Sequence, residues 1–280
     1  MRFIILLLTV LTLTFQSRGE IKITTTVKPL SDIVREVGGD RVEVSYIIPS
    51  NVNHHLYEYK TTDIKKIYDS DLFIYIGSSD HGIKSVVKSL PKEKIFPLIS
   101  LNGLFLVKDR DHEDIHPALW LDLLNGKTIA KFILDYLSQK DPKNKAYYEA
   151  NYNRFSKELD ELTSYGMEKF SKLKNRNFVS YHYEFPYFVG RFKLIYLADI
   201  EMGHGREPTP KHILNVIEKM KANNVKSVFT SKQLYNKKVL DLVLSKTNAK
   251  VIFLDTQGEN PSYLDMIRFN IDRVYEGLNY

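Results

Sequence analysis

Cysteine is absent from all 280 residues of the chain. This absence excludes a disulfide framework, a thiolate metal ligand and a thiol nucleophile. Because a bacterial lipoprotein carries its lipid on a cysteine at the cleavage site, we also expect a protein that is not a lipoprotein. The chain further lacks a glycine-rich phosphate-binding motif and a recognisable serine-nucleophile motif. We therefore expect a protein that is not an enzyme and has no catalytic or cofactor-binding residues.

Long hydrophobic runs are also missing, except at the N-terminus. Arg2 gives a positive start, residues 3–15 are almost all apolar, and Ser17 and Gly19 are small residues two apart. This layout is typical of a secretory signal peptide, and the run is shorter than the ~20 residues that a membrane-spanning helix needs. We expect residues 1–19 to be removed and the remainder to be a soluble periplasmic protein. A membrane anchor is the alternative.

The charged residues are not concentrated in blocks of one sign. The formal net charge is +6, and the lysines are spread along the chain. Such a distribution indicates solvated surfaces rather than a nucleic-acid interface, so we expect no nucleic-acid partner. With 43% hydrophobic residues, the chain is long enough for one large domain or for two small lobes, each with its own core.

From residue 21 onward, strand-like and helix-like segments alternate, and the same order begins again after residue 176. This alternation predicts parallel sheets with helices on both faces. The first set has predicted strands at 21–26, 42–48, 71–77 and 95–99, with helices at 29–37, 62–68 and 83–90. The second has strands at 178–181, 194–200, 225–230 and 251–254, with helices at 186–192, 210–223, 237–244 and 263–278.

Between the two sets lies a helix at 126–137 and then one long amphipathic stretch from Asp141 to about Leu173. As a single helix it would be about 48 Å long, which exceeds the width of one lobe. The predicted fold is α/β, with two lobes of mostly parallel sheet linked by one long rigid helix and a ligand cleft between them. The predicted boundaries are 20–140 for the N-terminal lobe, 141–175 for the linking helix and 176–280 for the C-terminal lobe.

Polar residues of metal-ligand type follow several of the predicted strands. His54 and His55 come after the second strand, His182 follows the strand that ends at Tyr181, and Asp255 ends another. Ligands of open parallel sheets bind at the carboxyl ends of the strands. Imidazole and carboxylate bind zinc, and also manganese or iron. Each residue also has a structural alternative, a packed histidine or, for Asp255, a helix cap.

Four stretches resemble the zinc/manganese solute-binding proteins of ABC importers. Residues 49–58 (PSNVNHHLYE) resemble the family loop P-G-x-x-D-P-H-x-Y-E-P, and residues 254–258 (LDTQG) resemble its L-D-P-L-G segment. The stretch that begins HYEFPYF at 182–188 and the helix start EPTP at 207–210 also have counterparts. The resemblance covers nearly all of residues 20–280.

This resemblance implies a monomeric periplasmic protein that carries a divalent metal ion to a membrane permease and its cytoplasmic ATPase. Zinc is the first expectation for the cargo, with manganese or iron as alternatives. By the family pattern, His55 is the first histidine ligand, His182 is the third ligand and Asp255 is the carboxylate ligand.

The second ligand departs from the family pattern. The family has P-H-x-W-L-D-P, whereas residues 117–123 read PALWLDL, so Ala118 stands where the histidine should be. His116 lies two residues away, in an acidic loop, and is the substitute we favour over a water molecule. The predicted metal ligands are therefore His55, His116, His182 and Asp255.

Two other functions fit parts of the sequence. His112, Glu113 and His116 satisfy H-E-x-x-H, the zinc-protease pattern. That pattern requires a helix, and Pro117 interrupts one here. The tyrosines near the predicted cleft could instead bind an organic solute or a metal chelate in the same fold.

Overall fold

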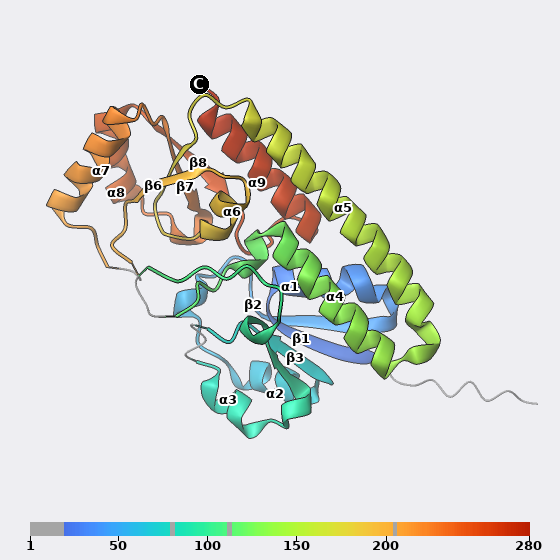
Figure 1. Ribbon diagram of the computed structural model, residues 1–280. Helices are drawn as coiled ribbons and strands as arrows, with labels where there is room; N and C mark the ends of the chain where they lie inside the picture. Colours follow the sequence, from blue (N-terminus) through green and yellow to red (C-terminus); the bar gives the residue numbers. More distant parts are fainter. Residues whose placement is uncertain (1–19, 79–81, 111–113, 204–205) are drawn as a thin grey trace, which may run out of the picture.

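The computed structural model describes residues 20–78, 82–110, 114–203 and 206–280 (Figure 1). The predicted signal peptide lies outside these residues, as do His112 and Glu113. No helix in the described ranges is both long and apolar enough to cross a membrane.

The N-terminal sheet has four parallel strands in the order β2-β1-β3-β4. Its strands are β1 (Ile21–Val27), β2 (Val42–Ile48), β3 (Leu72–Tyr75) and β4 (Ile95–Pro97), and the helices between them are α1 (Lys28–Gly38), α2 (Thr61–Asp69) and α3 (Lys84–Ser89). β1 is buried along most of its length, which fits its run of β-branched residues and its central place in the sheet. The predicted order of elements is confirmed.

The C-terminal sheet repeats this arrangement, in the order β6-β5-β7-β8 and with every pair parallel. Its strands are β5 (Asn177–Ser180), β6 (Ile195–Asp199), β7 (Ser227–Ser231) and β8 (Lys250–Leu254). Its helices are α6 (Pro186–Arg191), α7 (Pro210–Ala222), α8 (Lys237–Thr247) and α9 (Tyr263–Leu278). Thr209 caps α7, accepting a hydrogen bond from the backbone of His212, as its place before Pro210 predicts.

Two long helices connect the lobes. α4 (Leu123–Lys140) leads through a short 3₁₀ turn, Pro142–Asn144, into α5 (Lys145–Ser171). In Figure 1, α5 runs along one side of the molecule, beside α4 in the N-terminal lobe and beside α9 in the C-terminal lobe. Its 27 residues give a length of about 40 Å. The helix is shorter than predicted because Asp141 holds the preceding turn, accepting hydrogen bonds from Asn144 (2.6 Å) and Tyr148 (2.9 Å).

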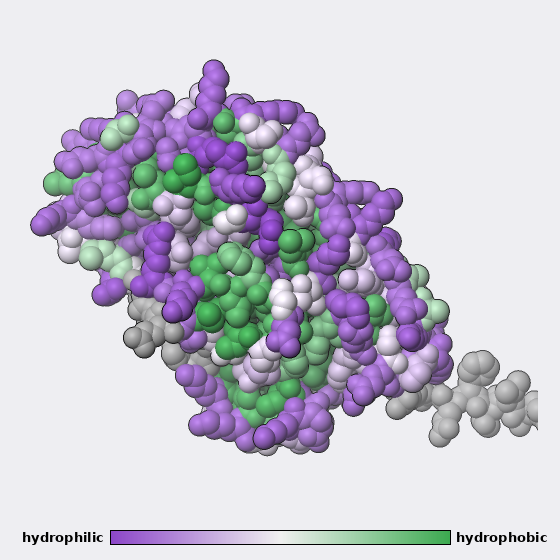
Figure 2. Space-filling model, viewed as in Figure 1, coloured by the Kyte–Doolittle hydropathy of each residue, from purple (hydrophilic) through white to green (hydrophobic). Residues whose placement is uncertain are grey.

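The main hydrophobic core is continuous across both lobes. It runs from Phe73 in the first sheet through Phe155 of α5 to Phe229 in the second sheet. A second, smaller cluster lies between the C-terminal sheet, α7 and α8. Figure 2 shows hydrophobic residues also gathered on one face where the lobes meet. The two lobes therefore share one main core, and the predicted domain boundaries stay a prediction.

A buried turn between the lobes fixes their relative position. The turn Leu119–Leu121 precedes α4, and the Trp120 indole donates a hydrogen bond to the carbonyl of Thr256 beyond β8 (2.8 Å). Asp122 caps α4 and accepts two hydrogen bonds from Arg191 of α6, at 2.9 and 2.7 Å. These contacts bring the carboxyl ends of the two sheets toward each other.

Candidate functional site

A small cavity lies between the lobes, at the carboxyl ends of strands from both sheets. It is lined by His54, His116, Pro117, Ala118, Trp120, His182, Glu184, Thr256 and Gln257. These residues come from the segments after β2, β5 and β8 and from the turn before α4. The space that the centre of a water-sized sphere can reach is about 10 Å³, which is room for about one water molecule. Such a cavity suits an ion and is too small for an organic solute.

His182 is a buried donor in this cavity, and a carboxylate orients its ring. It follows β5 directly, is only 6% exposed, and its Nδ1 is hydrogen-bonded to the carboxylate of Glu201. A carboxylate on one ring nitrogen directs the other nitrogen, Nε2, toward a metal. Burial acts to lower the pKa of His182. The hydrogen bond to Glu201 and the charges of Glu184 and Glu201 outweigh burial, so the pKa lies above its ordinary value.

His116 lies in the same cavity, as predicted, but both ring nitrogens already have hydrogen-bond partners. Nε2 pairs with the carbonyl of Tyr183 at 2.8 Å, and Nδ1 accepts from the backbone of Ala118 at 3.3 Å. The Tyr187 hydroxyl donates to the carbonyl of His116, which holds the loop against α6. His116 must exchange one of these ring contacts to bind an ion.

The paired histidines after β2 lie in the turn His54–Leu56. His54 lines the cavity, and its Nδ1 pairs with the side-chain amide of Gln257 at 3.0 Å. The side chain of His55, the predicted ligand, lies outside the described part of the structure, so its role stays a prediction.

Asp255 does not line this cavity. Its Oδ1 accepts hydrogen bonds from the backbone of Gln257 and Gly258, and its Oδ2 accepts two from Asn260. The carboxylate thus holds the loop after β8, and its role as a metal ligand stays a prediction. Within the described residues, no group of three or more histidine, aspartate or glutamate side chains is arranged to hold one ion.

Glu184 is a cavity residue that the sequence analysis did not select. It is 4% exposed, and its Oε1 accepts hydrogen bonds from the hydroxyls of Ser231 (3.0 Å) and Thr256 (3.2 Å). Its Oε2 is buried and has no hydrogen-bond partner in the described structure. Burial raises the pKa of Glu184, although the charge of His182 and the two hydroxyls act in the opposite direction. The only sequence signal was a glutamate among aromatic residues, two positions after His182.

The structure excludes the zinc-protease alternative. The backbone of His116 donates to Val107 at 2.8 Å, and Lys108 and Ile115 form an antiparallel bridge. The residues from Asp114 to His116 are therefore extended rather than helical, and the H-E-x-x-H pattern needs both histidines on one helix.

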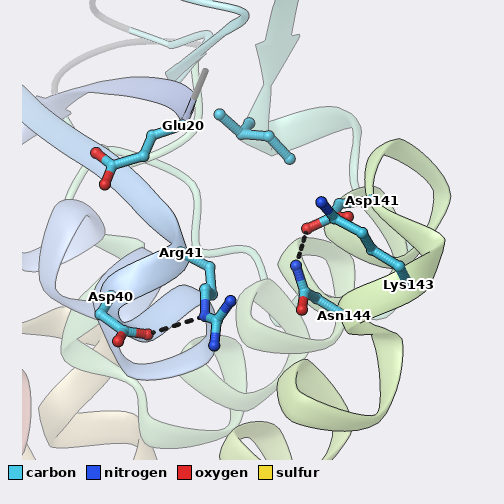
Figure 3. Close-up of a pocket in the computed structure, with 7 residues that line it drawn as sticks. Glu20, Asp40, Arg41, Asp141, Lys143 and Asn144 are labelled. Carbon is cyan, nitrogen blue, oxygen red and sulfur yellow. Dashed lines mark hydrogen bonds and ion pairs between the residues drawn. The ribbon is translucent and has the colours of Figure 1, made fainter. Parts of the chain in front are cut away.

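A larger cavity, of about 330 Å³, lies at the other end of the N-terminal sheet (Figure 3). Its side chains form pairs with one another, such as Asp40 with Arg41 at 3.4 Å and Asn144 with Asp141 at 2.6 Å. It lies next to Ile21 and Arg41, where β1 and β2 begin. Ligands of open parallel sheets bind at the opposite ends of the strands.

Known proteins resemble this chain over nearly its whole length. The manganese ABC transporter substrate-binding lipoprotein PsaA of Streptococcus pneumoniae is 28% identical over 280 residues, covering 94% of this chain and 90% of PsaA. A metal ABC transporter substrate-binding lipoprotein of Lactococcus lactis is 29% identical and covers 92% and 88%.

Solved structures have the same fold. The crystal structure of ZnuA superposes with a TM-score of 0.83 at 24% identity, covering 92% of this chain and 99% of ZnuA. The laminin-binding protein Lmb of Streptococcus agalactiae, described as bifunctional with adhesin and metal transporting activity, has a TM-score of 0.79 at 29% identity and covers 92% and 99%.

These relatives correct the predicted localisation. The relatives from Streptococcus pneumoniae and Lactococcus lactis are named lipoproteins, which contradicts the expectation of a protein that is not a lipoprotein. That expectation rested only on the absence of cysteine from the sequence.

The family model described as zinc-uptake complex component A, periplasmic, matches residues 23–277. The chain therefore belongs to this zinc/manganese solute-binding family of ABC importers, as the four sequence stretches predicted.

Proposed function

We propose that the protein binds one divalent transition-metal ion in the cavity between its lobes and delivers it to an ABC permease with its cytoplasmic ATPase. The family consists of substrate-binding proteins rather than enzymes. The observation that carries the proposal is the buried pair of His182 and Glu201, because a carboxylate behind an imidazole is the usual arrangement around a histidine metal ligand.

Zinc is the cargo that we propose first. Three histidines of the described structure line the cavity, and imidazole is a preferred zinc ligand. Manganese and iron accept the same donors, and selectivity among these metals depends on geometry and ligand number.

The other predicted ligands require movement. His116 must release the Tyr183 carbonyl or the Ala118 amide, and Asp255 must release part of its loop. We therefore propose His182 as the anchor, with His55, His116 and Asp255 joining the ion as the lobes adjust. A water molecule in place of the missing histidine at Ala118 remains the alternative to His116.

Calorimetry on metal-stripped protein tests this function. We expect one Zn²⁺ per chain, and His182→Ala should weaken binding at least ~10-fold, which corresponds to about 1.4 kcal/mol. His212→Ala is the matched control, because His212 lies on α7, outside the residues that line the cavity, and should bind like the wild type. A wild-type protein that binds no transition metal, or an unchanged His182→Ala variant, would contradict the proposal.

A further inference from the structure

The fold alone gives no reason for the buried carboxylate of Glu184. An unpaired carboxylate oxygen inside a protein is costly, because it has lost its hydration without gaining a partner. One oxygen of Glu184 is satisfied by two hydroxyls, while the other has no hydrogen-bond partner among the described residues. Such a group, at 4% exposure in a cavity wall, indicates a ligand that supplies a partner for this oxygen.

The carboxylate of Glu184 is held in place from both sides. Ser231 is the last residue of β7, Thr256 lies just beyond β8, and Glu184 itself follows β5. Hydroxyls from two neighbouring strand ends therefore fix Oε1, and the orientation of Oε2 follows from that. A ligand whose position is set by surrounding hydrogen bonds binds an ion at low cost in conformational entropy.

Ala118 lines the same cavity, and its methyl group cannot bind a metal. We propose that Glu184 binds the transported ion directly through Oε2, alongside His182. This inference rests on the proposed function, and it adds a ligand outside the set that the family pattern implies.

The inference also defines the class of ion. Glu184 carries one negative charge, and Glu201 places a second one behind His182. Carboxylates this close to a buried site favour a divalent cation over a monovalent one. A mixed nitrogen and oxygen donor set suits zinc, manganese or iron and disfavours a soft ion such as Cu⁺.

Glu184→Gln separates a ligand from a structural residue. Glutamine has the same shape, keeps an acceptor for Ser231 and Thr256, and replaces the charged Oε2 by an amide that cannot bind a cation. We expect the metal-free variant to melt no lower than the wild type, because a buried charge is removed. Its affinity for Zn²⁺ should fall at least ~10-fold, and the rise in melting temperature on adding Zn²⁺ should shrink accordingly.

A structural role predicts the opposite pair of results, a lower melting temperature without metal and an unchanged Zn²⁺ affinity, and that outcome would overturn the inference. Glu218→Gln, at an exposed position of α7, controls for the loss of one charge and should match the wild type. Should Glu184→Gln fail to fold, Glu184→Asp keeps the charge but withdraws it by one methylene and should also bind Zn²⁺ more weakly than the wild type. Wild-type affinity in Glu184→Asp would then overturn the inference.

The two proposals fail differently. If the wild type binds no Zn²⁺, Mn²⁺ or Fe²⁺, both are wrong. If the wild type binds and His182→Ala does not, but Glu184→Gln binds as tightly as the wild type, only the assignment of Glu184 is wrong.

Discussion

At the scale of single residues, the site depends on His182 and the two carboxylates near it. The hydrogen bond to Glu201 fixes the imidazole ring, and the charges of Glu184 and Glu201 favour its protonated form. A proton and a metal ion compete for the same nitrogen. Because the pKa of His182 is raised, this competition begins at a higher pH than it would for an ordinary histidine.

Zinc affinity should therefore fall as the pH decreases through the raised pKa of His182. In Glu201→Gln the main cause of that raised pKa is lost while burial still lowers it, so the loss of affinity should move to lower pH. At high pH, where His182 is neutral in both proteins, the variant should bind zinc about 10–100-fold more weakly, because its imidazole is less basic. Calorimetric titrations across the pH range measure both effects. A Glu201→Gln profile identical to that of the wild type would show that Glu201 does not control His182.

The sequence predicted only part of the site. His182 could be found because it directly follows a strand of recognisable pattern, and the carboxyl ends of parallel strands meet at one edge. The orientation of Glu184 depends on hydroxyl groups from distant segments of the chain. No local sequence pattern predicts such contacts, whereas the donors around Asp255 belong to the residues that directly follow it in the sequence.

At the scale of elements, the start of α4 joins the lobes. Asp122 is fully buried, caps the helix, and pairs with Arg191 of α6 through two hydrogen bonds. Asp122→Ala should lower the free energy of unfolding by about 3 kcal/mol, because it leaves the Arg191 guanidinium without its carboxylate partner and removes the N-cap of α4. Urea unfolding measures this change.

The matched control is Asp160→Ala, which breaks the ion pair with Lys127 between α4 and α5. Asp160 is 56% exposed, so solvent screens the pair and the loss should be below about 1 kcal/mol. Equal losses in the two variants would mean that the buried pair contributes no more than an ordinary surface contact.

The order of elements was predicted more completely than their contacts. Strands of β-branched residues and helices with apolar residues at helical spacing are local patterns, and each predicted strand and helix is present. The beginning of α5 was missed because it depends on the side chain of Asp141. The core that the two lobes share could not be predicted, because sequence periodicity shows which face of an element is buried and does not show which element packs against it.

At the scale of the whole molecule, two four-stranded sheets of the same topology face each other across a cavity the size of one water molecule. One core crosses both lobes, and α5 packs on α1 and α4 in one lobe and on α9 in the other. A wide hinge motion would break this packing, so we expect metal binding to involve small lobe rotations and loop changes.

The position of the bound ion is the most direct test of this account. Anomalous X-ray diffraction at the zinc edge, on crystals of the zinc-loaded protein, should show one principal peak between the lobes, about 2.0–2.1 Å from Nε2 of His182. Oε2 of Glu184 should be a second ligand of the same ion. A peak elsewhere, or no peak in this cavity at full zinc occupancy, would contradict the account.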